Sequence, residues 1–344
     1  MKKLIIALSA LMSLSVAGQS IAEVVTLRLH NHLPPKALAQ VDVITPWIEK
    51  VERESGGKIK VQVYPSMQLG GSPAQLMDQV KDGVVDMTWV NIGYTPGRYP
   101  ASEVFELPFM IKSAEGASKA LWEYFETNKL ADSEYRPWKI IGLNVHDAGQ
   151  IHMVNSPITS VDDFKGKKLR APSRVTTKMI ESLGATAIGM PITQVGESLS
   201  KGVVDGAILP WEIVPAIRAH EMVGYHTEID AENKALYTAV FVFAMNKQKY
   251  QSLPQELKKV IDENSGFAYA SLAGKAWDRS VPKARQLALD RGNKFNKIEG
   301  PELDKWKAAA EKVSNDWVEE VNKKGINGKE LIESANQLLI KYDN

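Results

Sequence analysis

Residues 72–90 read SPAQLMDQVKDGVVDMTWV, and this stretch contains a helix, the end of that helix and a strand. Ser72 followed by Pro73 is typical of a helix start, because serine caps the first turn and proline fits its first position. Apolar residues then recur at helical spacing, which predicts a buried face formed by Leu76, Met77 and Val80. Gly83 predicts the end of the helix, and Val84–Val90 is expected to form a strand.

The residues before this stretch have the same organisation. Val24–Leu29 predicts a buried strand, and Ala37–Arg53 has the apolar spacing of a helix that ends at Gly56 and Gly57. Lys58–Tyr64 alternates between polar and apolar residues, as a half-buried strand does. A series of strand, helix, strand, helix and strand predicts a parallel sheet that is covered by helices.

A second unit of this kind follows later in the chain. Its expected strands and helices, in alternation, are Lys168–Ala171, Val175–Leu183, Ala187–Met190, Thr193–Lys201 and Val203–Leu209. The joint between helix and strand reads DGVVDM at residues 82–87 and KGVVDG at residues 201–206. This similarity has two interpretations: two lobes of like topology, or a sequence that generally suits a helix end before a strand.

The rest of the chain adds one strand and long helices. Ala239–Met245 predicts a further apolar strand, whereas Gln255–Arg291 and Glu302–Leu339 are charged and amphipathic, as surface helices are. No flexible linker separates the two units. We therefore expect two α/β lobes with a cleft between them that the chain crosses more than once, and a ligand site at the carboxyl ends of the strands.

The N-terminus and the composition limit the class of protein. Lys2 and Lys3, the apolar run Leu4–Val16 and the small residues before Glu23 predict a secretory signal peptide that is cleaved after Ala22. Its removal leaves 40 basic and 41 acidic residues, a balance that argues against a nucleic-acid-binding protein. The chain has no cysteine, which excludes disulfides, thiolate metal sites and cysteine catalysis. An exported chain without cysteine and without a later spanning segment is expected in the bacterial periplasm.

Catalytic and metal-binding patterns are incomplete in this sequence. Neither serine stretch, at Ser72 or at Ser198, has the glycines of a nucleophile elbow, and no glycine-rich phosphate loop follows a strand. His30 and His32 could hold a metal ion, but the sequence offers no partner histidine or carboxylate nearby. We therefore predict no catalytic set, no metal site and no cofactor.

Binding features gather where strands are expected to end. Trp89, Asn91 and Tyr94 lie at or just after one strand, and Trp211 and Glu212 hold the corresponding place after Val203–Leu209. Arg170 ends the short strand Lys168–Ala171. An arginine there is either a solvated surface charge or a planar donor group that points into the cleft and suits a carboxylate.

At Arg170 the chain resembles a known family. The stretch FKGKKLRAP at residues 164–172, Leu183-Gly184-Ala185, Met190-Pro191 and GVVDG at 202–206 are similar to the substrate-binding proteins of tripartite ATP-independent periplasmic (TRAP) transporters, the DctP-like family. Tyr64-Pro65, Leu107-Pro108-Phe109 and Leu253-Pro254 also agree, so the resemblance covers nearly the whole mature chain.

The resemblance implies a two-lobed periplasmic-binding-protein fold with a long helix across both lobes and C-terminal surface helices. It implies lobe I in residues 23–147 plus 237–270, lobe II in 148–236, and connecting and C-terminal helices in 253–344. It also implies that Arg170 binds the carboxylate of a small organic acid, and that the closed protein delivers this acid to the membrane permease. Such a protein is a receptor and not an enzyme.

Departures from the family pattern bear on the ligand. Leu209 stands where many relatives have asparagine, and Gln150 stands where some have a second arginine. With Trp89, Tyr94 and Trp211 nearby, these changes favour one carboxylate on an aromatic or apolar body over sialic acid or a C4-dicarboxylate. The predicted ligand-binding residues are Arg170, Trp89, Asn91, Tyr94, His32, Gln150, Leu209, Trp211 and Glu212.

Two alternatives remain at this stage. The ligand could be a small cyclic or 2-oxo acid such as pyroglutamate, with the tryptophans only forming a wall. A periplasmic hydrolase or lyase on the same fold would need a base near the bound acid, and the sequence offers only His32 or Glu212 for it.

Overall fold

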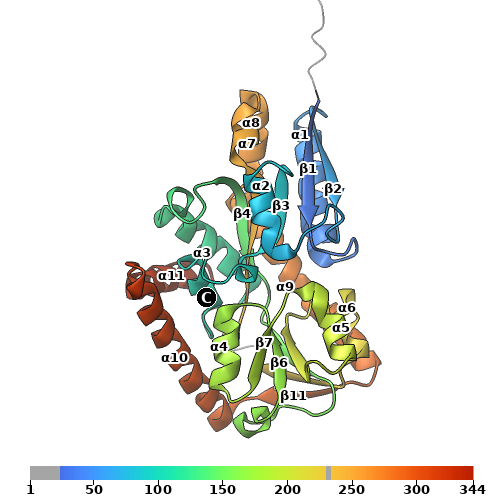
Figure 1. Cartoon of the computed structure of the whole chain (residues 1–344), viewed down its shortest axis with the longest axis vertical. Coiled ribbons are helices and arrows are strands. Elements are labelled where there is room, and N and C mark those ends of the chain that lie inside the picture. The colour runs from blue at the N-terminus through green and yellow to red at the C-terminus, as the bar shows by residue number, and fades with distance from the viewer. Residues whose placement is uncertain (1–23, 230–233, 344) are drawn as a thin grey trace, which may run out of the picture.

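The computed structural model describes residues 24–229 and 234–343, and its strands form two separate sheets (Figure 1). The first sheet has the order β2-β1-β3-β10-β4, formed by Ile59–Tyr64, Val25–Asn31, Met87–Asn91, Val240–Asn246 and Trp138–Val145. The second has the order β11-β9-β5-β8-β6-β7, formed by Lys294–Ile298, Tyr225–Ile229, Gln150–Met153, Gly206–Leu209, Lys168–Ala171 and Thr186–Gly189. The sheets are mixed and not purely parallel, because β10 runs antiparallel to both of its neighbours and β5 does the same.

Helices cover both sheets as the alternating pattern predicts. Around the first sheet lie a π-helical segment and three α-helices: η1 Ala39–Ile44, α1 Thr45–Glu54, α2 Leu76–Lys81 and α3 Ala114–Thr127. Short 3-10 turns connect them at Pro73–Gln75, Ile92–Tyr94, Ser102–Glu106 and Leu130–Asp132. Around the second sheet lie α4 Arg174–Ser182, α5 Val195–Ser200 and α6 Ile213–Ala216, with 3-10 turns at Val161–Phe164, Ile192–Gln194 and Ala219–Glu221.

The two similar joints at residues 82–87 and 201–206 have the same geometry. Gly83 and Gly202 end their helices at positive φ, 74° and 67°, where glycine meets no Cβ penalty. Asp86 then accepts a 2.7 Å hydrogen bond from the backbone N–H of Arg28 in the neighbouring strand, and Asp205 accepts the same bond from Lys168. Val84 and Val203 are exposed in both joints, which delays the start of β3 and β8 relative to the predicted strands.

Within the described residues, the chain passes between the lobes at several places. Residues 146–149 lead from β4 to β5, residues 234–239 lead into β10, and the long helix α9 Phe267–Asp290 packs on α3 and β4 as well as on α6. We propose lobe boundaries at 147/148 and 236/237, within the first two crossings.

The C-terminal third differs in detail from the predicted pair of long helices. Gly266, at φ 66°, separates α8 Gln255–Glu263 from α9, and β11 then adds a strand to the second sheet. α10 Gly300–Lys323 packs on α4, and α11 Gly328–Tyr342 packs on α3 (Figure 1). The short α7 Lys247–Ser252 follows β10. Among the helices of residues 24–229 and 234–343, none combines the length and the apolar character that a membrane crossing requires.

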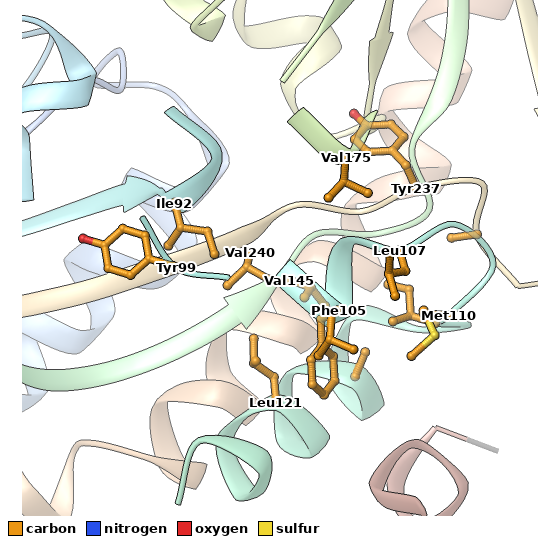
Figure 2. Close-up of a cluster of buried hydrophobic side chains, with 14 of the residues drawn as sticks. Ile92, Tyr99, Phe105, Leu107, Met110, Leu121, Val145, Val175, Tyr237 and Val240 are labelled. Carbon is orange, nitrogen blue, oxygen red and sulfur yellow. The ribbon is translucent and has the colours of Figure 1, made fainter. Parts of the chain in front are cut away.

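The largest buried cluster extends through both lobes. Figure 2 shows part of it, where Val145 and Val240 lie beside each other as a register pair of β4 and β10. Val175 of α4, in the second lobe, belongs to the same cluster as Phe105 and Leu121 of the first lobe. The apolar core is therefore continuous across the crossing segments in this arrangement. The predicted signal peptide lies outside the described residues.

Candidate functional site

A cavity with about 40 Å³ of free space lies between the two lobes, at the carboxyl ends of β3, β6 and β8. The lining residues come from both sheets and from the crossing segments: His32, Leu33, Trp89, Asn91, Tyr94, His146, Arg170, Pro172, Ile192, Pro210, Glu212, Ile213, Tyr237, Ala239 and Phe241.

Arg170 places a buried cation in this cavity. Its side chain is 2% exposed, and its Nε and Nη1 atoms each donate a 3.1 Å hydrogen bond to a backbone carbonyl, of Met190 and Ile208 respectively. These bonds fix the plane of the guanidinium, and the neutral Tyr94 hydroxyl is its further hydrogen-bonding neighbour. The carbonyls carry no net charge. Within the described part of the chain, no carboxylate pairs with this cation. A buried charge without a counterion is unfavourable, so the site is suited to an anion.

Three neutral groups face this cation. Burial raises the pKa of the Tyr94 and Tyr237 phenols, while the nearby charge of Arg170 opposes the shift. Burial lowers the pKa of His146 to about 3, and Arg170 adds to this effect. At neutral pH, therefore, none of these three side chains carries the negative charge that would balance Arg170.

Aromatic rings form one wall of the cavity. The ring of Trp89 stacks on that of Phe241, with centroids 4.3 Å apart, and the buried Trp277 lies behind both at 6.0 Å. The Trp89 indole N–H donates to the Tyr269 hydroxyl at 2.9 Å, which fixes the ring. Such a wall can pack against the flat face of an aromatic ligand.

Three buried polar atoms of the lining lack a hydrogen-bond partner in the described residues: His32 Nδ1, Tyr237 Oη and Glu212 Oε2. Burial lowers the pKa of His32 to about 3, so its ring, stacked on Trp89, is neutral. Burial raises the pKa of Glu212 to about 8, against the opposing effect of the Trp277 indole N–H, so its carboxyl is protonated at neutral pH. Since buried polar groups are normally paired, these atoms are candidate ligand contacts.

The cavity brings together six of the nine predicted binding residues: Arg170, Trp89, Asn91, Tyr94, His32 and Glu212. Asn91 caps the turn after β3, where its Oδ1 accepts a 2.7 Å bond from the N–H of Gly93. The other histidine of the possible metal pair, His30, does not line the cavity. Its ring bonds to Gln79 and to the backbone N–H of Leu69. No group of three possible metal ligands occurs among the described histidines and carboxylates.

Trp211 does not line the cavity, which corrects the expectation of an apolar wall at this position. Its indole packs edge-on against His152 and stacks on Phe295, and its N–H donates to Glu228 at 3.0 Å. Residues of the neighbouring strands explain why the Trp211 ring points into its own lobe. The Nε2 of His152 donates to the Leu209 carbonyl, and its Nδ1 lies 2.7 Å from that of His226, so a polar pocket inside the lobe receives the ring.

Leu209 and Gln150 also point away from the cavity. The two residues pair in register on β8 and β5. The Leu209 side chain is fully buried among the apolar residues of lobe II. The Gln150 amide bonds to the backbone of Ala148 and Ile229, so its hydrogen-bonding groups serve the fold. Neither residue can set ligand preference by contact, and the apolar wall consists of other side chains.

Sequence reasoning missed several lining residues. His146, Tyr237 and Ala239 come from the crossing segments, and Phe241 is the second residue of β10. The signal that could have indicated these residues was the expectation that the chain crosses the cleft more than once. A segment that passes between two lobes forms the floor of their cleft. No pattern in these segments indicates which side chains face inward.

Polar contacts hold the lobes together around the cavity. The Ile192 N–H donates to the Tyr94 hydroxyl at 3.1 Å, and Arg174 of α4 donates to both carboxylate oxygens of Glu103 from Nε at 2.8 and 3.0 Å. Arg174 also pairs with Glu320 of α10. These contacts need the lobes to be close together, so the described arrangement is a closed one.

Comparison with known proteins gives a consistent result. The sequence profile of the bacterial extracellular solute-binding proteins, family 7, matches residues 30–320. The C4-dicarboxylate-binding periplasmic protein DctP of Rhodobacter capsulatus is 27% identical over 90% of this chain and 91% of its own length.

Two crystal structures are more similar. A TRAP solute-binding protein from a marine metagenome, specific for aromatic acid ligands and bound to 3-hydroxybenzoate, is 48% identical, with a TM-score of 0.91 over 94% of this chain and 100% of its own. One from Rhodoferax ferrireducens, with copurified benzoate, is 44% identical, with a TM-score of 0.90 over 92% and 98% of the two chains.

Proposed function

Because this chain belongs to family 7 of the bacterial extracellular solute-binding proteins, the receptors of TRAP transporters, we propose that it binds an aromatic monocarboxylate in the cavity around Arg170. It delivers this acid to the permease subunits of its transporter. The family is one of transport proteins and not of enzymes, so His32 and Glu212 are ligand contacts and not catalytic bases.

The unpaired charge of Arg170 is the observation that carries the proposal. A guanidinium that is buried between two lobes, with only backbone carbonyls and the neutral Tyr94 hydroxyl around it, is stabilised by an anion that enters with its ligand. A carboxylate accepts two parallel hydrogen bonds from such a group, which fixes its orientation as well as its charge. The cavity offers a single cation in this position, which supports one carboxylate and not two.

The body of the ligand is assigned from the rest of the lining. Trp89 and Phe241 provide an aromatic face, and Ile192, Pro210 and Ile213 add apolar contacts from the other lobe. A ring of benzoate size gains from area burial and from ring stacking, about 0.5–1.5 kcal/mol for the geometry alone. The aromatic acids bound by the relatives that are 48% and 44% identical support the same ligand class.

Binding and closure are coupled in this proposal. Arg170 belongs to one lobe and Trp89 with Phe241 to the other, so the ligand makes both sets of contacts only when the lobes are closed. A ligand shifts a conformational equilibrium only through contacts that differ between the two states. The closed, loaded form is then the species that the permease recognises in the periplasm, after cleavage of the signal peptide behind Ala22.

Native mass spectrometry of the freshly purified protein, followed by calorimetry, tests the ligand class. We expect benzoate or a hydroxybenzoate to bind at least tenfold more tightly than succinate, pyroglutamate or sialic acid. Stronger binding of pyroglutamate or a 2-oxo acid would favour the small-acid alternative. Preference for succinate or a sugar acid would contradict the proposal.

A further inference from the structure

Six ring-bearing side chains of the cavity lining form one continuous series of contacts. Each ring centroid lies between 4.3 and 6.1 Å from the next one in the series. In order, the rings belong to Tyr94, His32, Trp89, Phe241, His146 and Tyr237. The series therefore has a phenol at each end and the stacked pair of Trp89 and Phe241 in its middle.

The Tyr94 end of the series lies beside Arg170. The Tyr94 hydroxyl accepts a 3.1 Å hydrogen bond from the N–H of Ile192, and the carbonyl of Met190, two residues earlier, accepts the bond from Arg170 Nε. The Tyr94 oxygen is thus paired within the protein and does not require a ligand.

The Tyr237 end reaches the same region through the two crossing segments. The N–H of Gly149 donates to the Tyr237 carbonyl at 3.0 Å, so the two segments pair with each other. In the first of them, Asp147 accepts a 3.3 Å bond from the N–H of Trp211, just after β8. The Arg170 guanidinium is bonded near the end of the same strand. Burial raises the pKa of Tyr237 and the charge of Arg170 opposes this rise, as a nearby cation does.

The Tyr237 hydroxyl, unlike that of Tyr94, is buried without a partner. The residue is 1% exposed, and its oxygen makes no hydrogen bond to any described residue, the neighbouring Asp147 and Glu212 included. A Cβ atom on Gly149 would lie 1.8 Å from the Tyr237 ring, so glycine at this position leaves room for the ring in its orientation. A fixed, buried donor on a cavity wall is suited to an acceptor that the ligand supplies.

From this arrangement we propose that Tyr237 is a second anchor of the ligand carboxylate, to which its hydroxyl donates a hydrogen bond alongside Arg170. The inference rests on the proposed function of the cavity. It places the carboxylate where the two ends of the ring series meet the cation, and the ligand ring against Trp89 and Phe241.

The hydrogen-bonding capacity of a carboxylate supports a second donor. Two N–H groups of Arg170 are used by backbone carbonyls, whereas a carboxylate can accept about four bonds. A phenol donates to a charged oxygen in a short bond that is stronger than one between neutral groups. Because the phenol is neutral, it adds this bond without adding a second charge to the site.

Calorimetry with benzoate, 3-hydroxybenzoate and phenylacetate tests the proposal on the wild type and Tyr237→Phe. The variant should raise the Kd of all three acids by a similar factor, about ten- to a hundredfold, because they share only the carboxylate and the ring. Its ligand-free melting temperature should not fall, since the hydroxyl that it removes has no partner before the ligand binds. Combined with Arg170→Lys, its effect should be smaller than in the wild type, because both donors act on one carboxylate.

Tyr99→Phe is the matched control. Tyr99 is also 1% exposed and its hydroxyl also lacks a partner among the described residues, but its ring stacks on Tyr135 inside lobe I, outside the cavity. This variant should leave both the Kd and the melting temperature unchanged.

The outcomes separate this inference from the function on which it rests. An unchanged Kd in Tyr237→Phe, or a loss confined to 3-hydroxybenzoate, would overturn the carboxylate contact and leave the aromatic-acid receptor intact. A lower ligand-free melting temperature with no loss of affinity would assign the hydroxyl to the fold instead. Failure of every aromatic acid to bind the wild type would overturn both proposals.

Discussion

Gly93 and Ser173 belong to different lobes, yet a Cβ atom on Gly93 would lie 2.5 Å from the Cβ of Ser173 and 3.1 Å from the carbonyl oxygen of Pro172. Real Cβ atoms do not approach so closely, so only glycine allows the turn after β3 to contact the start of α4 in this way. The same turn carries Asn91 and Tyr94 into the cavity. Because the two backbones are this close, the closed arrangement of the lobes requires glycine at position 93.

Gly93→Ala should hinder closure without unfolding either lobe. We expect the Kd of an aromatic acid to rise at least tenfold, and small-angle scattering should show a smaller decrease in radius of gyration at saturating ligand than for the wild type. Gly189→Ala is the matched control, since a Cβ at that position meets nothing within 4 Å.

A rescue variant separates this steric effect from others. Ser173→Gly removes the closest contacting atom, so the Gly93→Ala/Ser173→Gly protein should regain part of the lost affinity. Unchanged affinity in Gly93→Ala would contradict the steric argument.

Two substitutions separate the contribution of the Arg170 charge to ligand binding from that of its planar donor group. Arg170→Ala should weaken binding about ten- to a hundredfold, because a charge-assisted bond in a dry site contributes roughly 1.5–3 kcal/mol. Arg170→Lys keeps the charge but loses the planar pair of donors, so binding should still fall clearly in calorimetry. Lys168→Ala, which removes an exposed cation from the same strand, should have little effect. An equal Kd for all of these proteins would exclude Arg170 as the anchor.

The ion pair between Arg174 and Glu103 should favour the closed form. Their side chains are 19% and 6% exposed, so water screens the pair less than a surface pair. Removing it should weaken ligand binding by roughly 1–2 kcal/mol, or about five- to thirtyfold. A double-mutant cycle with Arg174→Ala and Glu103→Gln, read by calorimetry, would measure the coupling.

Arg218→Ala is the control for this cycle, because Arg218 pairs with Glu221 on the exposed surface. It should leave ligand affinity unchanged. A coupling energy near zero between Arg174 and Glu103 would mean that the pair is equally formed in the open protein.

Binding should weaken in mild alkali because of Glu212. Its pKa of about 8 lies well above the usual carboxyl value, so the ionised form becomes dominant above pH 8 and repels an anionic ligand. We expect the Kd to rise about tenfold between pH 7 and pH 9, and Glu212→Gln to remove most of this change. The titratable and charged groups around it, which could add to the pH profile, are His32, Lys36, Asp42, Tyr94, His146, Asp147, Arg170, Tyr237, Arg279 and Lys283. A flat profile for the wild type would argue against a neutral Glu212.

The buried pair of His152 and His226 should destabilise the protein in acid. Burial lowers the pKa of His152 to about 4 and that of His226 to about 2, below the ordinary value of 6.5. The folded state therefore binds fewer protons than the unfolded one below pH 6.5, and stability from the neutral pair is lost as the pH falls.

A variant isolates this effect from the other buried groups. We expect the free energy of unfolding of the wild type, relative to His226→Gln, to fall by up to about 1.4 kcal/mol per pH unit between pH 6.5 and 4. Chemical denaturation at several pH values measures it. A difference that does not vary with pH would contradict a neutral pair.

Local sequence patterns determined most of the secondary structure. The glycines at 83 and 202, the serine–proline helix start and the alternation at residues 58–64 act within one or two turns of the chain, so their effect can be read without the fold. The resemblance in residues 164–172 predicted Arg170 as the anchor, and strand ends located Trp89, Asn91, Tyr94 and Glu212 near one cleft. The break of the C-terminal helices and the strand β11 were not predicted, because their pairing partners lie far away in the sequence.

Tertiary structure alone decided which side chains face the ligand cavity. Trp89 lies near the end of β3 and Trp211 just after the end of β8, and both are almost fully buried. Trp89 lies against Phe241 on the cavity wall, whereas Trp211 enters a pocket of His152, Phe295 and Glu228 inside its lobe. An apolar residue suits a position in a core as well as a position on a cavity wall, so its type does not distinguish the two. Which of them it occupies depends on the neighbours that other parts of the chain bring to each side of the strand.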